Sequence, residues 1–461
     1  MAGLNSIEHV VVLMLENRSF DHMLGFLYTD AGNKSPNGDA YEGLSGTESS
    51  QGSDGKPVSV FRLTPQTQDL YFYPGADPGE GWAATNNQLW GSTDAPANGL
   101  VPPMSGFVTD YAKAIADNKA KGWYVFGGTA ENWIMGCHTP ETLPVLSALA
   151  RGYAVCDHWF GSAPTMTMPN RAFLCAGTSQ GHMDDKIKKF TCPSIFGSMT
   201  KANVSWKIYG YDAPPLTKAD FPDTSTAPAA NFGRFPDFQS DAKAGKLAAY
   251  TFLEPSWGSD GNSQHPNYNV ALGEQLLLDT YRTVRDGPDW NSTLLIITYD
   301  EHGGCFDHVP PQWGATPPDS TAGEYGFDFT RFGPRVPTIL ISPLIPAGSV
   351  FRVPEGSTPL DHTSVLATLE QRFGLDPLTK RDAAAPHVGA ALSLTTARDD
   401  DPLAGVTAPT PPTNPTGLIE QPSHLQQIQA ALIADDQGIP QSQLDSLHSN
   451  ADYSRFISQH G

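Results

Sequence analysis

Short, unbroken runs of apolar and β-branched residues recur along the chain, and each is followed at once by polar residues. The first run covers Ile7 to Leu15 (IEHVVVLML) and ends at the polar segment ENRS. An apolar run without alternation is typical of a strand that is buried on both faces, as in a parallel sheet. Similar runs predict strands at 153–156, 204–209, 249–253, 293–299 and 336–342.

Stretches with helical periodicity separate these runs, at 143–150, 269–285 and 362–373. Strands that alternate with helices are typical of the α/β class, so the pattern predicts a layered α/β sandwich. In such a fold, polar residues that follow a buried strand lie at the edge of the sheet where ligands bind. The segments directly after the apolar runs are therefore the first places to look for a site.

The rest of the chain predicts insertions and an appendage rather than further domains. Segments 28–105 and 211–246 are rich in Gly, Ser, Asp and Pro and lack periodicity, so we expect long loop insertions over the core. Residues 401–417 form a linker rich in Pro and Thr. Helical patterns at 418–435 and 442–459 then predict a short C-terminal appendage, and we expect one main domain at 1–400, the linker at 401–417 and a helical appendage at 418–461.

Composition narrows the class of partner. The 461 residues include 28 Lys and Arg against 49 Asp and Glu, a net charge of −21, which disfavours nucleic acid or an anionic membrane held by charge alone. We find no transmembrane segment, because no window of about 18 apolar residues occurs. The start lacks a basic region followed by an apolar stretch, so we expect no signal peptide, although a mature secreted chain stays open.

The five cysteines are an odd number without CxxC spacing, which indicates neither a disulfide scaffold nor a zinc cluster. A single disulfide between Cys175 and Cys192 is the alternative that the sequence leaves undecided.

Carboxylates at the ends of two predicted strands indicate a metal site. Asp300 and Glu301 are adjacent after the run at 293–299, and two such charges repel unless a cation lies between them. With Glu16 and the amide of Asn17, they offer oxygen donors that favour Ca²⁺, Mg²⁺ or Mn²⁺. A nearby imidazole leaves Zn²⁺ open, so we expect one divalent metal ion of one of these four kinds. The competing interpretation is that Glu16 and Asn17 cap a helix that begins near Phe20.

A second polar segment, PTMTMPNR at 164–171, supplies a candidate nucleophile in Thr167. A threonine hydroxyl is a poor nucleophile at neutral pH and would need the metal to stabilise its alkoxide. Phosphorus suits this arrangement, because a metal also neutralises a phosphate oxygen while a histidine protonates the leaving alcohol. The competing interpretation is an ordinary loop hydroxyl.

Several blocks in a fixed order resemble one family. They are EHVVVLMLENRSFDHMLG (8–25), TMPNR (167–171), SQHP (263–266), LLIITYDEHGGCFDHVPP (294–311), RVPTILISPLIPAG (335–348) and DHTSVLATLEQRFGL (361–375). From about Ile7 to about Leu375 the chain resembles the phosphoesterase family of bacterial and plant non-specific phospholipases C and an acid phosphatase. The resemblance implies an alkaline-phosphatase-like fold, a three-layer α/β/α sandwich with a mostly parallel sheet. It also suggests a secreted or periplasmic enzyme, with the cytoplasm left open.

The resemblance also implies roles for individual residues. It gives Glu16, Asn17, Asp300 and Glu301 as metal ligands, Thr167 as the nucleophile and His265 as a histidine that contacts the phosphate. We expect Arg171 to steady the developing charge, and either His265 or His308 to protonate the leaving alcohol. We place Asn170, Glu80 and His302 among the substrate-binding residues. His302 has a second role open to it, which is to hold a neighbouring carboxylate.

The chain departs from the family pattern at one informative position. Many relatives carry a DPGH segment whose histidine lies near the phosphate, whereas this chain has DPGE at 77–80. A carboxylate at Glu80 would repel a phosphate dianion. His138, from another loop, is a candidate replacement for the missing histidine.

Aromatic residues in the predicted loops suggest a cage for a quaternary ammonium group such as choline. They are Tyr71, Phe72, Tyr73, Trp82, Trp90, Trp123, Tyr124 and Trp133. Lids that pack over the core are the competing interpretation, and for most of these residues the better one.

The sequence thus predicts a metal-dependent phosphoric ester hydrolase, a phospholipase C that acts on phospholipid head groups through a phosphothreonine intermediate. An acid phosphatase that acts on soluble monoesters is the alternative within enzymes. A metal-binding pseudoenzyme or interaction protein is the alternative of another class. It is suggested by Glu80 and opposed by the complete ligand set and Thr167.

Overall fold

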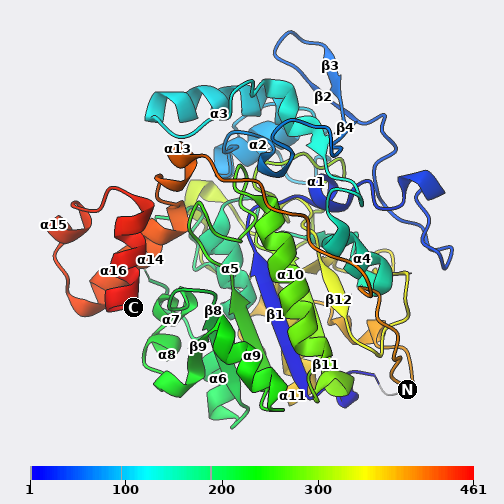
Figure 1. The fold of residues 1–461 in the computed structure, drawn as a ribbon, viewed down its shortest axis with the longest axis vertical. Coiled ribbons are helices and arrows are strands. Elements are labelled where there is room, and N and C mark those ends of the chain that lie inside the picture. The colour runs from blue at the N-terminus through cyan, green and yellow to red at the C-terminus, as the bar shows by residue number, and fades with distance from the viewer. Residues whose placement is uncertain (1–2, 95, 187–188) are drawn as a thin grey trace.

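A computed structural model describes residues 3–94, 96–186 and 189–461, and an eight-stranded sheet forms its centre (Figure 1). The strand order is β13-β6-β12-β11-β1-β10-β8-β9. Neighbouring strands are parallel except where β12 pairs with β11 and with β6. The strands are β1 (His9–Leu15), β6 (Ala154–Val155), β8 (Trp206–Gly210), β9 (Phe232–Arg234), β10 (Tyr250–Glu254), β11 (Thr293–Tyr299), β12 (Ile339–Ile341) and β13 (Ser349–Val350).

All six apolar runs contribute a strand to this sheet, so the predicted α/β class with a mostly parallel sheet is confirmed. The register at the centre matters for the site. Leu15, the last residue of β1, pairs with Tyr299, the last residue of the parallel strand β11. Because both strands end at the same level, Glu16 and Asp300 follow side by side at one edge of the sheet.

Helices cover the sheet on both faces. In Figure 1, α10 (Val270–Arg285) crosses in front of it and contacts α4 (Pro144–Gly152) and α9 (Phe235–Lys243). Behind the sheet, α11 (Thr363–Phe373) contacts α5 (Thr167–Ala176). These contacts give the three layers that the resemblance implies. The other short elements of the main body are α1 (Phe20–Leu24), β5 (Gly136–Cys137), β7 (Trp159–Phe160), α6 (Ile195–Lys201), β14 (Leu360–Asp361) and α12 (Lys380–Ala384).

The two segments expected to be loop insertions contain regular elements, so that expectation was wrong in part. Segment 28–105 holds β2 (Ser49–Gln51), β3 (Pro57–Ser59), β4 (Phe61–Arg62) and α2 (Trp82–Trp90), and α3 (Phe107–Lys121) follows it. Segment 211–246 holds α7 (Thr217–Asp220), α8 (Pro222–Ser225), β9 and α9. Most of these elements are too short to show periodicity among so many Gly, Pro and Asp residues.

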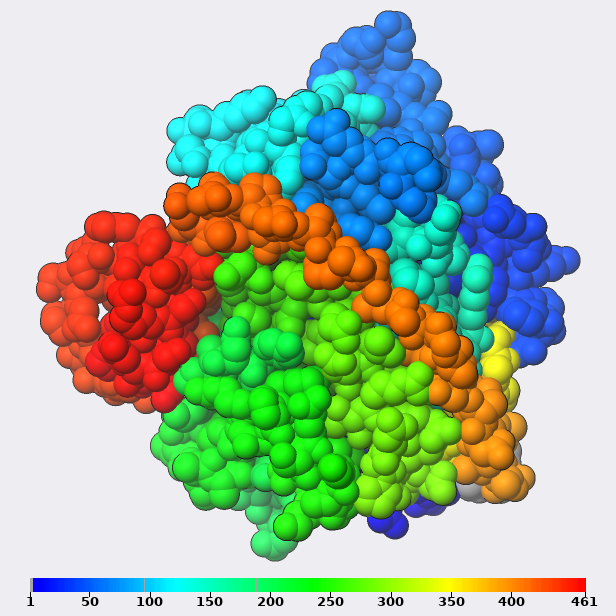
Figure 2. Space-filling view, in the orientation of Figure 1, coloured from blue at the N-terminus to red at the C-terminus, as the bar shows by residue number. Residues whose placement is uncertain are grey.

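Residues 401–417 run across the surface in the orange segment of Figure 2 and lead to the C-terminal helices. These are α13 (Thr416–Ile419), α14 (His424–Gln437), α15 (Gln441–Leu444) and α16 (Asn450–His460). Leu425 and Leu432 of α14 join the core of the main body. Ile433 packs instead with Phe456 and Ile457 of α16.

None of the described helices is both long and apolar enough to cross a bilayer. All five cysteines lie in the described ranges and are free thiols. The alternative of a disulfide between Cys175 and Cys192 is therefore wrong.

Candidate active site

Two buried carboxylates lie without hydrogen-bond partners where β1 and β11 end. Glu16 is 3% exposed and Glu301 is 1% exposed. Neither Oε2 of Glu16 nor Oε1 of Glu301 has a partner among the described residues. The other oxygen of Glu301 accepts a hydrogen bond from the Gly303 N–H at 2.7 Å. Buried polar atoms are nearly always paired, so these two oxygens are suited to a cationic partner.

Asp300 joins the two ends of this cluster. Its Oδ1 accepts hydrogen bonds from the N–H groups of Asn17 and Glu301, each at 2.8 Å. Asn17 has a positive φ of 55°, which is uncommon for a residue other than glycine. This turn directs the backbone N–H of Asn17 toward Asp300. The competing interpretation, in which Glu16 and Asn17 cap α1, is wrong, because the cap is Ser19, whose Oγ accepts a hydrogen bond from the His22 N–H at 3.1 Å.

The charges of the cluster also favour a cation. Burial, with the nearby Asp300 charge, raises the pKa of Glu16 to about 7. Burial and the charges of Glu80 and Asp300 raise the pKa of Glu301 well above its usual range. A divalent cation among these oxygens would stabilise the ionised forms, and an all-oxygen donor set suits a hard cation. The donors present therefore suit a divalent metal ion by their chemistry, and the ligand atoms of Glu16, Asp300 and Glu301 do not all lie within 4.8 Å of one another in this structure.

Thr167 is the first residue of α5 and faces this cluster. Its Oγ1 donates a hydrogen bond to Oδ1 of Asn17 at 3.1 Å, and the residue is 2% exposed. The N-terminus of a helix carries partial positive charge that favours an anion such as an alkoxide or a phosphate. Thr167 thus lies beside a predicted metal ligand in an environment that stabilises negative charge.

Asn170 was predicted to bind substrate, and the structure places its amide on the loop before Thr167. Its Oδ1 accepts from the Ala163 N–H at 3.0 Å. Its Nδ2 donates to the carbonyls of Ala163, Thr165 and Met166 at 3.0–3.1 Å. These bonds fix the turn that leads into Thr167.

Arg171 ties the nucleophile helix to the carboxylate cluster. Its Nε donates to Oδ2 of Asp300 at 3.0 Å, and its Nη2 donates to the carbonyls of Met14 and Leu15. The guanidinium lies 4.5 Å from the ring centre of Trp257, an aromatic contact that the sequence did not indicate. Arg171 contributes positive charge one helical turn after Thr167.

His265 and Glu80 form an ion pair next to Asn17. Nε2 of His265 lies 3.2 Å from Oε1 of Glu80, and Nδ2 of Asn17 donates to the same oxygen at 2.6 Å. Nδ1 of His265 lies 3.0 Å from the carbonyl of Pro266. Since both ring nitrogens face acceptors, the ring favours the doubly protonated form. Burial by itself lowers the pKa of His265, but the charges of Asp77, Glu80 and other carboxylates outweigh it and raise this pKa to about 10.

His302 lies next to Glu301, one of the predicted metal ligands. Its Nδ1 lies 3.1 Å from Oε2 of Glu301, and its Nε2 lies 2.7 Å from Oε1 of Gln88. Burial lowers the pKa of His302 to about 3, so the ring is neutral. Of its two predicted roles, this position favours the one next to the Glu301 carboxylate, and Nδ1 has no hydrogen bond among the described residues. His362 contacts the backbone beside this cluster, since its Nε2 donates to the Asp300 carbonyl at 2.6 Å.

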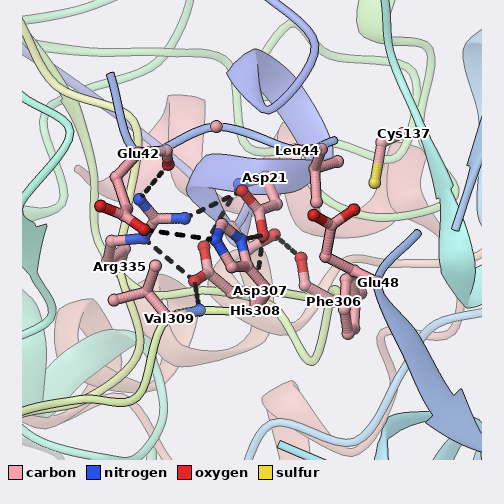
Figure 3. Close-up of polar contacts among 12 residues, drawn as sticks. Asp21, Glu42, Leu44, Glu48, Cys137, Phe306, Asp307, His308, Val309 and Arg335 are labelled. Atoms are coloured by element: carbon pink, nitrogen blue, oxygen red, sulfur yellow. Dashed lines mark hydrogen bonds and ion pairs between the residues drawn. The ribbon is translucent and has the colours of Figure 1, made fainter. Parts of the chain in front are cut away.

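His308 lies in a different group of charges, drawn in Figure 3. Its Nδ1 is 2.6 Å from Oδ2 of Asp21, whose other oxygen accepts from Nη2 of Arg335 at 2.8 Å. Nε of Arg335 donates to Asp307 at 3.0 Å. Gly303 and Gly304 both have positive φ, and this turn separates the chain at His308 from Glu301. Among the described residues the structure brings His265, and not His308, into contact with Glu80, the carboxylate that also accepts from the Asn17 amide.

His138 does not take the place of the missing DPGH histidine. Its Nδ1 lies 3.1 Å from Oγ1 of Thr142, and its ring meets His22 edge-on at 5.2 Å. Burial lowers the pKa of His138 to about 3. The imidazole that contacts Glu80 is that of His265.

The aromatic loop residues pack mostly against one another and against an arginine. The guanidinium of Arg331 lies 4.6 Å from the ring centre of Trp90 and 5.2 Å from that of Trp82. Tyr73 stacks on Trp133 with ring centres 4.5 Å apart. These contacts agree with aromatic lids that pack over the core.

Asp185 is a site contact that the sequence did not reveal. Its Oδ1 accepts a hydrogen bond from the Met168 N–H at 2.7 Å, directly after Thr167. No motif surrounds Asp185, so only the folded structure shows that it holds the first turn of α5.

Comparisons with known proteins indicate a hydrolase that acts on phosphate esters. The family model described as "Phosphoesterase family" matches residues 7–376. Non-specific phospholipase C1 of Arabidopsis thaliana is 36% identical over 399 residues, which cover 82% of this chain and 69% of that protein. Phospholipase C A of Mycobacterium tuberculosis (strain H37Rv) is 29% identical over 418 residues, covering 81% and 74%. The chain belongs to the phosphoesterase family.

Two solved structures resemble this chain at much lower sequence identity. One is a protein in the alkaline phosphatase superfamily from Vibrio parahaemolyticus, 13% identical with a TM-score of 0.34, covering 54% of this chain and 65% of that chain. The other is phosphonate monoester hydrolase of Agrobacterium radiobacter, 14% identical with a TM-score of 0.32, covering 54% and 72%.

Proposed function

We propose that this chain is a metal-dependent phospholipase C that cleaves phospholipids into diacylglycerol and a phosphorylated head group through a phosphothreonine intermediate. The observation that carries the proposal is the hydrogen bond from Oγ1 of Thr167 to Asn17, at a helix N-terminus beside two buried carboxylate oxygens without partners among the described residues. The phospholipid substrate is proposed because the relatives at 29–36% identity are named phospholipases C.

Glu16, Asn17, Asp300 and Glu301 would hold the metal ion. When bound, a divalent cation supplies positive charge that stabilises a threonine alkoxide and a phosphate oxygen.

The chain's own residues then account for the two chemical steps. Thr167 releases its proton to solvent, and its Oγ1 forms a bond to phosphorus as the bond from phosphorus to the leaving alcohol oxygen breaks. His265, which is protonated beside Glu80, donates its proton to that oxygen. Neutral His265 then takes a proton from the attacking water, whose oxygen bonds to phosphorus as the bond from phosphorus to Oγ1 of Thr167 breaks. Oγ1 takes a proton from solvent, and the phosphorylated head group is released. Arg171 and the amides of α5 stabilise the added negative charge.

A pair of substitutions at Thr167 tests the mechanism. We expect Thr167→Ala to lower kcat by at least about 1,000-fold while metal content and the melting temperature stay unchanged, because only the attacking oxygen is lost. Thr167→Ser keeps the oxygen and is expected to retain activity. The assay measures hydrolysis of phosphatidylcholine and of a soluble aryl phosphate monoester, with elemental analysis of each protein. Ordinary activity in Thr167→Ala would exclude the covalent mechanism, and activity on the monoester alone would indicate a phosphatase.

A further inference from the structure

A histidine of the C-terminal helices reaches the first turn of the nucleophile helix through one buried aspartate. His424 is the first residue of α14, and its Nδ1 lies 3.3 Å from Oδ2 of Asp185. The other oxygen of Asp185 accepts the hydrogen bond from the Met168 N–H. Asp185 is only 4% exposed, and its Oδ2 has no hydrogen bond among the described residues, whereas the His424 side chain that approaches it is 45% exposed. The His424 imidazole is therefore the group that approaches this oxygen.

The N-terminal end of α14 is fixed to the main body, so this contact is well defined. Oε1 of Gln421 accepts from the Tyr124 N–H at 2.8 Å, and the Gln421 carbonyl accepts from Oγ of Ser259 at 2.8 Å. Leu425, the next residue after His424, is completely buried in the main core. In Figure 1 the C-terminal helices flank the side of the body that holds α5.

The charge around His424 suits an ion pair with Asp185. Burial by itself lowers the pKa of His424, but the carboxylates of Asp185, Glu80 and Asp77 outweigh it and raise this pKa to about 8. The imidazole is therefore largely protonated at neutral pH. Removing it would leave the Asp185 carboxylate buried without a cation, which is unfavourable and would disturb the turn that Asp185 holds.

We propose that His424 is a positioning residue of the active site, which holds Asp185 and through it the first turn of α5 that carries Thr167. The C-terminal helices would then complete the site instead of only flanking it. This inference rests on the proposed role of Thr167 as the nucleophile.

The test uses steady-state kinetics of the full chain on a soluble aryl phosphate ester. We expect His424→Ala to lower kcat by about tenfold with KM nearly unchanged, because a misplaced nucleophile slows the chemical step and leaves binding intact. His424→Lys keeps a cation at this position and is expected to recover part of the lost kcat. Asp436→Asn is the matched control. It breaks another ion pair of α14 with the same segment, Lys189 to Asp436 at 2.8 Å, and is expected to leave kcat unchanged.

Asp185→Asn provides an independent measurement. It removes the charge that His424 faces, so we expect a similar loss of kcat and no further loss in the double variant, as for residues that act through each other. Equal kcat in His424→Ala and wild type would overturn the inference, as would additive losses in the double variant. Activity retained by Thr167→Ala would reject the proposed nucleophile, whereas an inactive Thr167→Ala with a normal His424→Ala would reject only this inference.

Discussion

At the scale of single residues, Asn17 connects the parts of the site. Its N–H donates to Asp300, its Oδ1 accepts from Thr167, and its Nδ2 donates to Glu80. The two ends of an amide are chemically different, so these partners fix its orientation. Glu80 supplies the acceptor for the NH₂ end. The exchange of histidine for glutamate therefore adds a strong partner for Asn17 as well as a negative charge.

The ligand assignment can be tested at Glu16. We expect Glu16→Gln to weaken metal binding and to lower activity together, because a charged ligand becomes neutral. The dissociation constant for the metal should rise by at least about tenfold, and excess metal should restore part of the activity. Elemental analysis and activity measured against added metal give both quantities.

Glu274→Gln is the matched control for that experiment. Glu274 is also buried with its pKa raised to about 7 by burial, but its two oxygens accept hydrogen bonds from the Val145 and Leu146 N–H groups. We expect its metal content to equal that of wild type. A wild-type protein without metal and indifferent to chelators would contradict the assignment.

Glu80 allows a second prediction at this scale. We expect Glu80→His to lower KM for a phosphate ester by about threefold or more, because it removes a negative charge beside the site and adds a hydrogen-bond donor. Glu80→Gln removes the charge without the imidazole and separates the two effects. Steady-state kinetics near pH 6.5 measure the change. An unchanged KM in both variants would show that substrate phosphate does not approach this carboxylate.

Much of the site followed from the sequence because two parallel strands end in register. Glu16 and Asn17 after one strand must lie near Asp300 and Glu301 after its neighbour. Contacts made by loops were harder to predict. His265 contacts Glu80 while His138 contacts Thr142, and no periodicity distinguishes these histidines in the sequence.

At the scale of elements, buried strands were predicted well because unbroken apolar runs such as the one in β11 are long enough for a strand and too short for most helices. Short helices such as α2 and α9 were missed, since their sequences contain many polar residues and lie in segments rich in Gly and Pro. Turns also decide where a side chain arrives. The two consecutive positive φ values at Gly303 and Gly304 carry the chain from Glu301 toward the charge group of His308.

That charge group predicts a pH-dependent contribution to stability. Although burial opposes both shifts, Asp21 raises the pKa of His308, and Arg335 with His308 lowers the pKa of Asp21. The ion pair therefore contributes fully between the ordinary pKa values of Asp and His, about 4 and 6.5. Its contribution is lost as pH rises through the raised pKa of His308.

We accordingly expect His308→Gln to reduce the free energy of unfolding by about 1–2 kcal/mol at about pH 5.5 and by less at about pH 8.5. Urea unfolding at the two pH values measures the difference. His448→Gln removes an exposed imidazole and is expected to change neither value. An equal loss at both pH values would show that packing, and not the ion pair, explains the effect.

At the scale of the whole molecule, the question is whether the C-terminal helices form a separate unit. The composition of 401–417 indicated a linker, and the helices beyond it have a small apolar cluster of their own. Leu425 and Leu432 nevertheless lie in the main core, and His424 contacts Asp185. These contacts favour a part that folds together with the main body. The sequence predicted the helices from their periodicity, but periodicity does not reveal which surface an apolar face covers.

Leu425 provides the test, because its side chain belongs to the C-terminal helices and is buried in the main core. All nine tryptophans lie before residue 401, so their fluorescence reports only on the main body. We expect Leu425→Ala to lower the free energy of unfolding measured by tryptophan fluorescence by about 2–5 kcal/mol, with a single transition that coincides with loss of helical circular dichroism. Gln443→Ala, at an exposed position of α15, should leave both signals unchanged. If Leu425→Ala instead caused early loss of helix with a normal fluorescence midpoint, residues 418–461 would be an independently unfolding appendage.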